Sequence, residues 1–287
     1  MLKIINKLNF FFRKKKKIIF VDDYVNTKSI EQELIKEKIL AIDTEFDWRS
    51  TYFPILSLIQ IATPTKIFIL DCLKCANLDW LKKILEDKKK LVIFHSCRSD
   101  TTVLSKNLNI KIKKSFDIQI AEQKINGGEI LNYAAIVKKY FSVSLDKSQT
   151  NSNWLKRPLS RKQIGYASED VNYLIEIYNF QKKTLKKKNL LEKIFKKSEN
   201  EASLGNQSLK YLRLKKVKNK FSTRDKQIFK WREELAEKDN VPPAFIFRNK
   251  DLKILSKIKS SDRDAKKKIM SILGDNQLTK IFMLNFL

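Results

Sequence analysis

Apolar residues in the first half of the chain gather into short runs rich in Ile, Val and Leu, separated by helix-like segments of mixed polarity. Short β-branched runs bounded by turn residues are typical of buried strands. The runs therefore predict strands, and the longer segments between them predict helices. We expect strands at residues 39–43, 56–62, 67–71 and 91–95, and helices at residues 29–37, 78–86, 101–108 and 131–141.

The spacing of these strands predicts the type of sheet. The runs at residues 56–62 and 67–71 are separated only by Thr63-Pro64-Thr65-Lys66, which is a turn signal. So short a connection is typical of an antiparallel hairpin, whereas the later alternation of strand and helix is typical of parallel strands. The sequence therefore predicts an α/β fold in which helices pack on a mixed sheet.

Beyond residue 160 the pattern favours helices alone. Residues 164–195 predict one long helix or two abutting helices. A further helix at residues 223–236 would be capped by Ser222 or Thr223, because these side chains accept hydrogen bonds at helix starts. Val241-Pro242-Pro243 then breaks the chain, and we expect two or three short helices after it.

Polar residues at 198–208 form the expected linker between two domains. We predict an α/β domain at residues 20–205 and a small all-α domain at residues 206–287. An apolar and basic arm at residues 1–19 precedes both. Its charges follow the apolar stretch, which is not the order found in a signal peptide. An alternative is an amphipathic arm that touches RNA or a membrane.

Composition and charge narrow the class of protein. The 287 residues include 60 Lys+Arg and 32 Asp+Glu, for a net charge of +28, and 43% are hydrophobic. Such a chain can build a core, and its charge favours a polyanionic partner such as nucleic acid. The apolar runs are too short to span a membrane, and the sequence lacks a Gly-rich loop for a nucleotide cofactor. Three cysteines do not make a disulfide scaffold, so we expect a reducing, cytoplasmic compartment.

Acidic residues stand at the end of the first predicted strand. Asp43 and Glu45 are two positions apart, so in an extended segment both side chains point to the same face. Two carboxylates that close repel each other unless a cation or a proton lies between them, and oxygen ligands favour Mg²⁺ or Mn²⁺. For the pair alone, a strand end with two solvated acids is the favoured interpretation.

Two later segments carry matching chemistry. Asp100 follows the strand at residues 91–95 by five positions, at the start of a predicted helix. Tyr166 and Asp170 are four positions apart, so on a helix they share one face, where a phenol and a carboxylate could hold a water against a metal. Each segment also has an ordinary interpretation, as a helix-start acid or an exposed helix face.

Taken in chain order, these four acids and the tyrosine resemble the DEDD exonuclease superfamily, in the subclass with Tyr in its last motif and within it the ribonuclease D family. The resemblance covers about residues 20–200 and implies a ribonuclease H-like mixed sheet. It rests on Asp43-Thr44-Glu45-Phe46, on Tyr52-Phe53-Pro54-Ile55-Leu56 and the strand after it, on His95 before Asp100, on Leu145-Asp146-Lys147-Ser148, on Trp154-Leu155-Lys156-Arg157-Pro158-Leu159 and on Tyr166-Ala167.

The resemblance also implies roles for the acids. Asp43, Glu45 and Asp170 would hold one divalent ion, Mg²⁺ or Mn²⁺, and Asp43 with Asp100 would hold a second. Tyr166 would orient the attacking water. The implied function is a 3′-5′ exoribonuclease that trims RNA 3′ ends, such as those of tRNA precursors. The alternatives are an exonuclease acting mainly on DNA and a nucleic-acid-binding module without activity.

The tail resembles a single HRDC helical domain. Trp231-Arg232, Pro242-Pro243-Ala244-Phe245 and Leu252 carry this similarity. The family often has two such domains, whereas this sequence shows about one. We therefore expect a less complete clamp around the RNA. Asn151 and Asn153 depart from the family's usual basic and acidic residues, which predicts altered RNA contacts.

Residues near the motifs are candidates for substrate contacts. Phe46 and Tyr52 could stack on the terminal bases, as could Trp48, although core packing is an equal possibility for Tyr52 and Trp48. By their position in the motifs, we also expect substrate contacts from His95, Trp154 and Arg157. Cys72, Cys75, Cys97 and His95 could be a zinc set, but the cysteines follow different strands, which disfavours it. The substrate candidates are Phe46, Tyr52, His95, Trp154 and Arg157.

Overall fold

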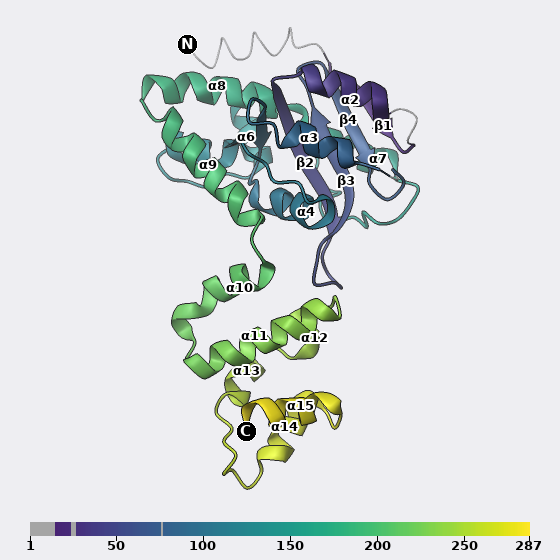
Figure 1. Cartoon of the computed structure of the whole chain (residues 1–287). Helices are drawn as coiled ribbons and strands as arrows, with labels where there is room; N and C mark the ends of the chain where they lie inside the picture. Colours follow the sequence, from purple (N-terminus) through teal and green to yellow (C-terminus); the bar gives the residue numbers. More distant parts are fainter. Residues whose placement is uncertain (1–14, 24–26, 76) are drawn as a thin grey trace. The chain divides into compact units, whose positions relative to one another are not determined.

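The structure, a computed structural model, describes residues 15–23, 27–75 and 77–287. It divides into two compact units (Figure 1). The first holds the described residues up to Asp47 together with residues 55–206, and the second holds residues 48–54 and 207–287. Within the described ranges, no helix is long and apolar enough to cross a membrane.

The first unit is built on a mixed sheet, as predicted. In the part of the chain that the structure describes, six strands pair in the order β1-β4-β3-β2-β5-β6. β3 is antiparallel to both β2 and β4, whereas the other pairs are parallel. The strands are β1 (Lys17–Val21), β2 (Ile39–Asp47), β3 (Ile55–Ala62), β4 (Lys66–Asp71), β5 (Leu91–Phe94) and β6 (Ser115–Asp117).

Helices cover both faces of this sheet. Alternate residues along β2 point to opposite faces, so Ala41 joins one hydrophobic cluster while Leu40 and Ile42 join the other. One cluster packs against α5 to α8, and the other against α2, α3 and α4, which cross in front of the strands in Figure 1. The helices are α2 (Thr27–Lys36), α3 (Asp79–Leu85), α4 (Arg98–Leu108), α5 (Ile118–Ile125), α6 (Tyr133–Phe141), α7 (Arg161–Asn172), α8 (Leu174–Lys187) and α9 (Leu191–Gly205).

The sequence analysis placed a linker where the structure has helix α9. Ser198, Ala202 and Gly205 lie on one buried face of this helix. A Cβ on Gly205 would lie 2.1 Å from the Thr101 hydroxyl of α4. Small polar residues looked like a loop because their packing partners lie about a hundred positions earlier. The stretch at residues 164–195 likewise forms parts of three helices, not one or two.

Two strands were also missed. Residues 17–19 of the expected arm belong to β1, which pairs with β4, while residues 1–14 lie outside the described residues. The run of lysines before Ile18 hid this strand, although the Lys16 side chain is itself buried and donates to the Asn172 carbonyl at 2.8 Å. β6 is too short to give a periodic signal.

The second unit is all-helical, as predicted, with its own hydrophobic core around Ile228, Leu252 and Phe282. The Ser222 side chain caps α11 and forms a capping box with Asp225. Four short helices follow α11 in the structure, one more than the most expected. The helices are α10 (Leu209–Val217), α11 (Thr223–Lys238), α12 (Pro243–Ile246), α13 (Asn249–Leu255), α14 (Ala265–Leu273) and α15 (Gln277–Phe286).

The loop between β2 and β3, residues 48–54, belongs to this helical unit. Its Tyr52 is fully buried, and the hydroxyl donates to the Glu233 carboxylate at 3.2 Å. Arg213 donates to the same carboxylate at 2.9 Å and lies 4.5 Å above the Tyr52 ring. Asn240 accepts from two backbone N–H groups of the loop. The prediction that Tyr52 stacks on a base is therefore wrong, because its ring is a core residue of the helical unit.

Candidate active site

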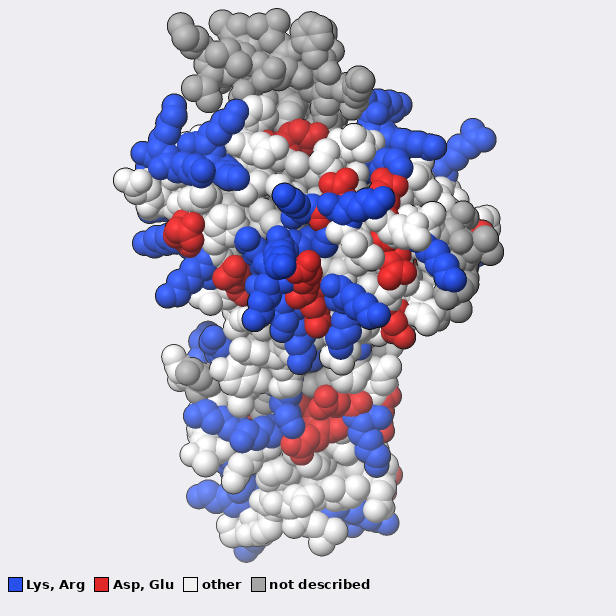
Figure 2. All heavy atoms as spheres, turned by 45° about the horizontal axis from the view of Figure 1, so that its top comes forward, with Lys and Arg blue, Asp and Glu red and all other residues white. Residues whose placement is uncertain are grey.

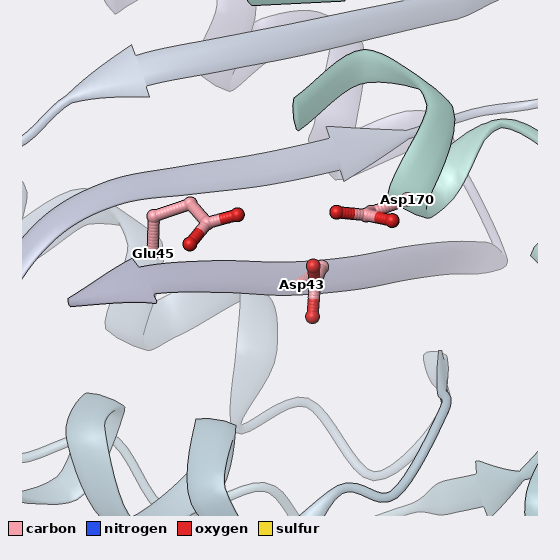
Figure 3. A group of neighbouring side chains, drawn as sticks. All are labelled: Asp43, Glu45 and Asp170. Atoms are coloured by element: carbon pink, nitrogen blue, oxygen red, sulfur yellow. The ribbon is translucent and has the colours of Figure 1, made fainter. Parts of the chain in front are cut away.

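Three carboxylates converge on the central strand β2. Asp43 and Glu45 project from one face of this strand, and Asp170 reaches them from α7 (Figure 3). One carboxylate oxygen from each lies within 4.8 Å of the other two. The two-residue spacing on an extended strand and the packing of α7 against it produce this convergence. The structure thus brings together three of the four predicted metal ligands.

The fourth acid is held beside them by a threonine. Asp100 is buried in the first turn of α4, and Thr44 Oγ1 donates to its Oδ1 at 2.7 Å. Thr44 stands between Asp43 and Glu45 on β2, so this bond ties α4 to the strand that carries both acids. Sequence analysis missed Thr44, since a lone Thr between two acids has no signal of its own.

Burial makes this set costly to ionise. It raises the pKa of Glu45 to about 10, with the neighbouring charges of Asp43 and Asp170 adding to the shift. Burial likewise raises the pKa of Asp170 to about 7 and holds those of Asp43 and Asp100 well above the ordinary aspartate value. Four such carboxyls need protons or cations between them. Their oxygens therefore fit hard divalent ions.

We expect the metal-free protein to lose stability as the pH rises from 5 to 8. The folded state keeps protons on Glu45 and Asp170 at pH values where the unfolded chain has released them, so the free energy of unfolding falls with pH. The slope is at most about 1.4 kcal/mol per pH unit for each carboxyl. Thermal melting of the wild type and of the Glu45→Gln/Asp170→Asn variant, both in EDTA and at several pH values, measures this pH dependence.

The same melts should respond to divalent ions in a pH-dependent way. Mg²⁺ or Mn²⁺ replaces the protons, so it should raise the melting temperature more at pH 8 than at pH 5. The double variant should show a flatter pH slope and little response to either ion. A wild-type melting temperature that rises from pH 5 to 8 in EDTA, relative to the variant, would contradict the assignment.

Tyr166 lies on the same helix as Asp170 and lines the same cavity as Asp43 and Asp170. Its ring is 5.9 Å from that of Trp154, and its hydroxyl lies 3.3 Å from Thr150 Oγ1. The hydroxyl also lowers the pKa of Asp170 by hydrogen bonding to its carboxylate. Burial and the charge of Asp170 raise the pKa of Tyr166 itself. The phenol therefore stays protonated, which suits it to orienting a water.

A cavity of about 330 Å³ opens beside these groups. His95 lines it with its Nε2 3.4 Å from the Leu131 carbonyl oxygen, and burial lowers its pKa; its contact with the substrate stays a prediction. The wall also includes the motif residues Leu145, Asp146 and Lys147, and the start of α6, which sequence analysis did not single out. The lining residues are Asp43, His95, Asn132, Tyr133, Ala134, Leu145, Asp146, Lys147, Thr150, Tyr166, Asp170 and Leu174.

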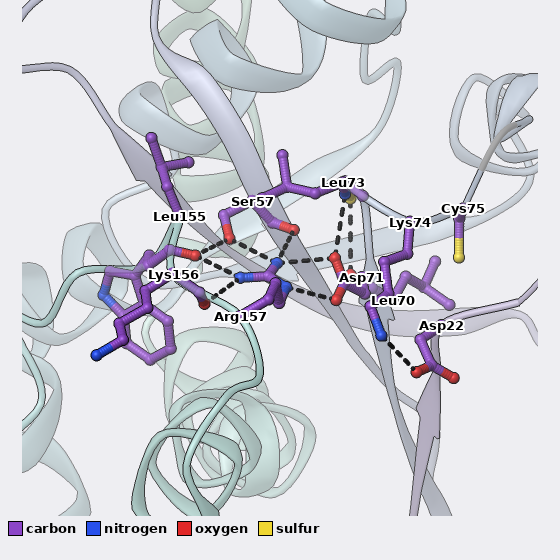
Figure 4. Close-up of polar contacts among 12 residues, drawn as sticks. Asp22, Ser57, Leu70, Asp71, Leu73, Lys74, Cys75, Leu155, Lys156 and Arg157 are labelled. Atoms are coloured by element: carbon purple, nitrogen blue, oxygen red, sulfur yellow. Dashed lines mark hydrogen bonds and ion pairs between the residues drawn. The ribbon is translucent and has the colours of Figure 1, made fainter.

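Arg157 was expected to contact the substrate, but the structure gives it another partner. Its guanidinium donates to both oxygens of the buried Asp71, at 2.6 and 2.7 Å, and to the Trp154 carbonyl at 2.7 Å (Figure 4). A further bond joins it to Ser57 Oγ at 3.1 Å. Trp154 is 3% exposed. Direct contact with the substrate is contradicted for the buried Trp154 and stays a prediction for Arg157; both residues fasten the loop before α7 to β3 and β4.

Phe46 and the cysteines are the remaining residues to which sequence analysis gave a possible binding role. Phe46 follows a bulge in β2 and is half-buried against the α2–α4 side of the sheet, so its contact with a base stays a prediction. Cys75 Sγ donates to the Val21 carbonyl and Cys97 Sγ to the Ser198 carbonyl. In the described ranges, Asp43, Glu45 and Asp170 form the one group of three or more His, Cys, Asp or Glu side chains whose ligand atoms all lie within 4.8 Å of one another. The zinc alternative therefore has no structural support.

Comparison with known protein families gives two matches. Residues 18–186 match the model of a 3′-5′ exonuclease domain, and residues 224–280 match the HRDC domain. The first match includes all four acids and Tyr166. The second lies within the helical unit.

Curated relatives named ribonuclease D extend the similarity. One from Desulfotalea psychrophila is 31% identical over 235 residues, which cover 77% of this chain and 62% of the relative. One from Haemophilus influenzae is 35% identical over 152 residues, or 53% of this chain and 38% of the relative. The chain thus spans less than two thirds of the length of these relatives.

Solved structures show the same fold. Escherichia coli RNase D, described as an exoribonuclease involved in structured RNA processing, superposes with a TM-score of 0.80 at 21% identity, covering 93% of this chain and 75% of that one. A Trypanosoma brucei RNase D in complex with RNA U12 gives a TM-score of 0.55 at 21% identity, covering 61% of this chain and 66% of that one.

Proposed function

This chain belongs to the 3′-5′ exonuclease family, and from that premise we propose that it hydrolyses RNA from the 3′ end. The observation that carries the proposal is the convergence of Asp43, Glu45 and Asp170, with the Tyr166 hydroxyl hydrogen-bonded to Asp170. The family implies divalent metal ions, and these carboxyls have the oxygen donors and the raised pKa values that such ions require.

In this proposal the four acids would hold two ions, Mg²⁺ or Mn²⁺. Asp43, Glu45 and Asp170 would hold one, and Asp43 with Asp100 would hold the other. When bound, the pair supplies a nucleophilic water at neutral pH and neutralises charge on the phosphoryl and leaving oxygens. Thr44 fixes the Asp100 carboxylate, and the protonated phenol of Tyr166 orients the water.

We propose RNA rather than DNA as substrate, with tRNA precursors as one source of 3′ ends. The relatives named ribonuclease D support RNA. The high positive charge supports a polyanion of either kind, and Lys and Arg side chains cover much of the face shown in Figure 2. A DNA exonuclease stays the alternative, because the four acids do not by themselves distinguish RNA from DNA, and ribose selection depends on contacts to the 2′-OH. Three free thiols support a cytoplasmic location.

Digestion of end-labelled RNA tests this function. With Mg²⁺ or Mn²⁺, a 5′-labelled oligonucleotide should shorten stepwise, and a 3′-labelled one should release its label as a mononucleotide at once. EDTA should stop both reactions. A matched DNA oligonucleotide should be cut more slowly. Release of label first from the 5′ end, or internal cutting, would overturn the proposed direction.

The helical unit contains a basic cleft that suits a role in RNA binding. Its cavity of about 330 Å³ is lined by Arg213, Lys216, Arg232 and Arg248, with Glu233 as the acid on the wall. Glu233 is buried and accepts hydrogen bonds from Arg213 and Arg232. Lys216 and Arg248 are exposed, which leaves them accessible to phosphates.

We expect the Lys216→Gln/Arg248→Gln variant to bind long RNA more weakly and to cut a short oligonucleotide normally at saturation. Each lost phosphate contact should reduce the slope of log K against log salt by about 0.7. Fluorescence anisotropy in EDTA measures this slope. Point substitutions are preferable to deletion, because removing the unit would expose the Tyr52 ring.

The matched control is Lys257→Gln/Arg263→Gln, which removes the same charges from exposed positions of this unit that do not line the cleft. Equal slopes for the two variants would mean that the cleft has no special part in binding.

A further inference from the structure

The junction between α7 and α8 contains a hydroxyl group from another helix. α7 ends at Asn172 and α8 begins at Leu174. In a continuous helix, the Tyr173 N–H would donate to the Glu169 carbonyl four residues earlier. Here the Tyr133 hydroxyl accepts from the Tyr173 N–H at 3.2 Å and donates to the Glu169 carbonyl at 2.9 Å. A side chain thus stands between the donor and acceptor of one helical hydrogen bond, a known cause of helix kinks.

The interrupted turn is the one that carries Asp170. The two backbone groups that Tyr133 bridges, at residues 169 and 173, lie on either side of this acid. Tyr133 is buried on α6 and lines the same cavity as Asp43 and Asp170. α6 is itself fixed at its start, where the Asn132 side chain accepts from the Ala135 N–H at 3.0 Å. The orientation of the last turn of α7 therefore depends on a hydroxyl group that another helix, α6, carries.

We infer that Tyr133 is a positioning residue, whose hydroxyl sets the last turn of α7 so that the Asp170 carboxylate faces Asp43 and Glu45. This inference rests on the proposed function, because that function requires Asp170 to hold a metal ion together with Asp43 and Glu45. A phenylalanine would keep the ring packing, but it would leave the Glu169 carbonyl and the Tyr173 N–H without their bridge. These groups can then pair only if the turn straightens, which moves Asp170.

The Tyr133→Phe variant of the full chain tests the inference. Loss of a group that orients a metal ligand costs about 10- to 100-fold in metal affinity or activity. We expect Mn²⁺ binding, measured by calorimetry, to weaken by that factor. With a short RNA at saturating metal, kcat should fall while KM stays within twofold.

The matched control is Tyr140→Phe. Tyr140 lies on the same helix, and its hydroxyl donates to Glu122 at 2.8 Å, away from the cavity. This variant should lose some thermal stability and keep wild-type Mn²⁺ binding and kcat. If Tyr133→Phe behaves in the same way, Tyr133 is merely structural and the inference is wrong. If the wild type cuts no RNA at all, the proposed function fails, and the Mn²⁺ affinities still decide the role of Tyr133.

Discussion

Replacing Asp43 by Asn should abolish RNA hydrolysis and leave RNA binding intact. Asp43 lies between the other acids, within reach of Glu45 and Asp170 and electrostatically coupled to Asp100. Removing its charge should disable the whole set, so we expect a loss well beyond the roughly 100-fold cost of an outer metal-site partner. Asp170→Asn should act in the same way. Single-turnover digestion of a short labelled RNA measures the loss.

Binding separates this effect from misfolding. RNA affinity comes mainly from Lys and Arg at phosphates, so both variants should bind RNA at least as tightly as the wild type in EDTA. Glu169→Gln is the control, because it removes the acid next to Asp170 that is outside the cluster. Either Asn variant cutting RNA at near wild-type rates would refute the metal assignment.

Replacing Tyr166 by Phe should slow hydrolysis with little loss of metal affinity. The variant keeps the ring that packs near Trp154 and removes only the hydroxyl. General acid–base catalysis typically contributes about 10²- to 10⁴-fold, and a group that only orients water contributes less. Because the pKa of this phenol is raised, we expect the low end, a fall in rate of about 100-fold or less.

Two measurements decide how Tyr166 acts. Mn²⁺ affinity should fall only slightly, in contrast to the acid variants, because all four carboxyls remain and only the hydrogen bond to Asp170 is lost. Tyr178→Phe, a buried tyrosine of α8 that does not line the cavity, should leave the rate unchanged. An unaltered rate for Tyr166→Phe, with chemistry as the slow step, would remove this residue from the mechanism.

The elements whose signals are local were predictable from the sequence. β2 to β5 are runs of buried apolar residues, and Ser222 caps its helix through groups three residues away. The acids Asp43 and Glu45 also gave a local signal, since spacing on a strand fixes their common face. The convergence of Asp170 on them could be inferred only from the resemblance, because it depends on how α7 packs.

The errors concern residues whose partners are distant in sequence. Arg157, within a motif, was expected to contact the substrate, whereas its guanidinium pairs with Asp71 on β4. Tyr52 was expected to stack on a base, yet its hydroxyl donates a hydrogen bond to Glu233 on α11. The segment that contains Gly205 was predicted to be a linker because the local sequence does not show that Gly205 packs against Thr101. Nothing in the local pattern distinguishes an arginine or an aromatic ring that binds a ligand from one that packs within the fold.

The loop at residues 48–54 has a consequence for how related chains can exchange parts. The polypeptide passes between its two units after Asp47, after Pro54 and after Asn206, rather than at a single peptide bond. A chimera spliced only at residue 206 would graft a foreign helical unit onto the native Tyr52, without the Glu233 and Arg213 that complement it. Recombination should therefore preserve function only when the loop is inherited with the helices, as one module encoded in two separate stretches.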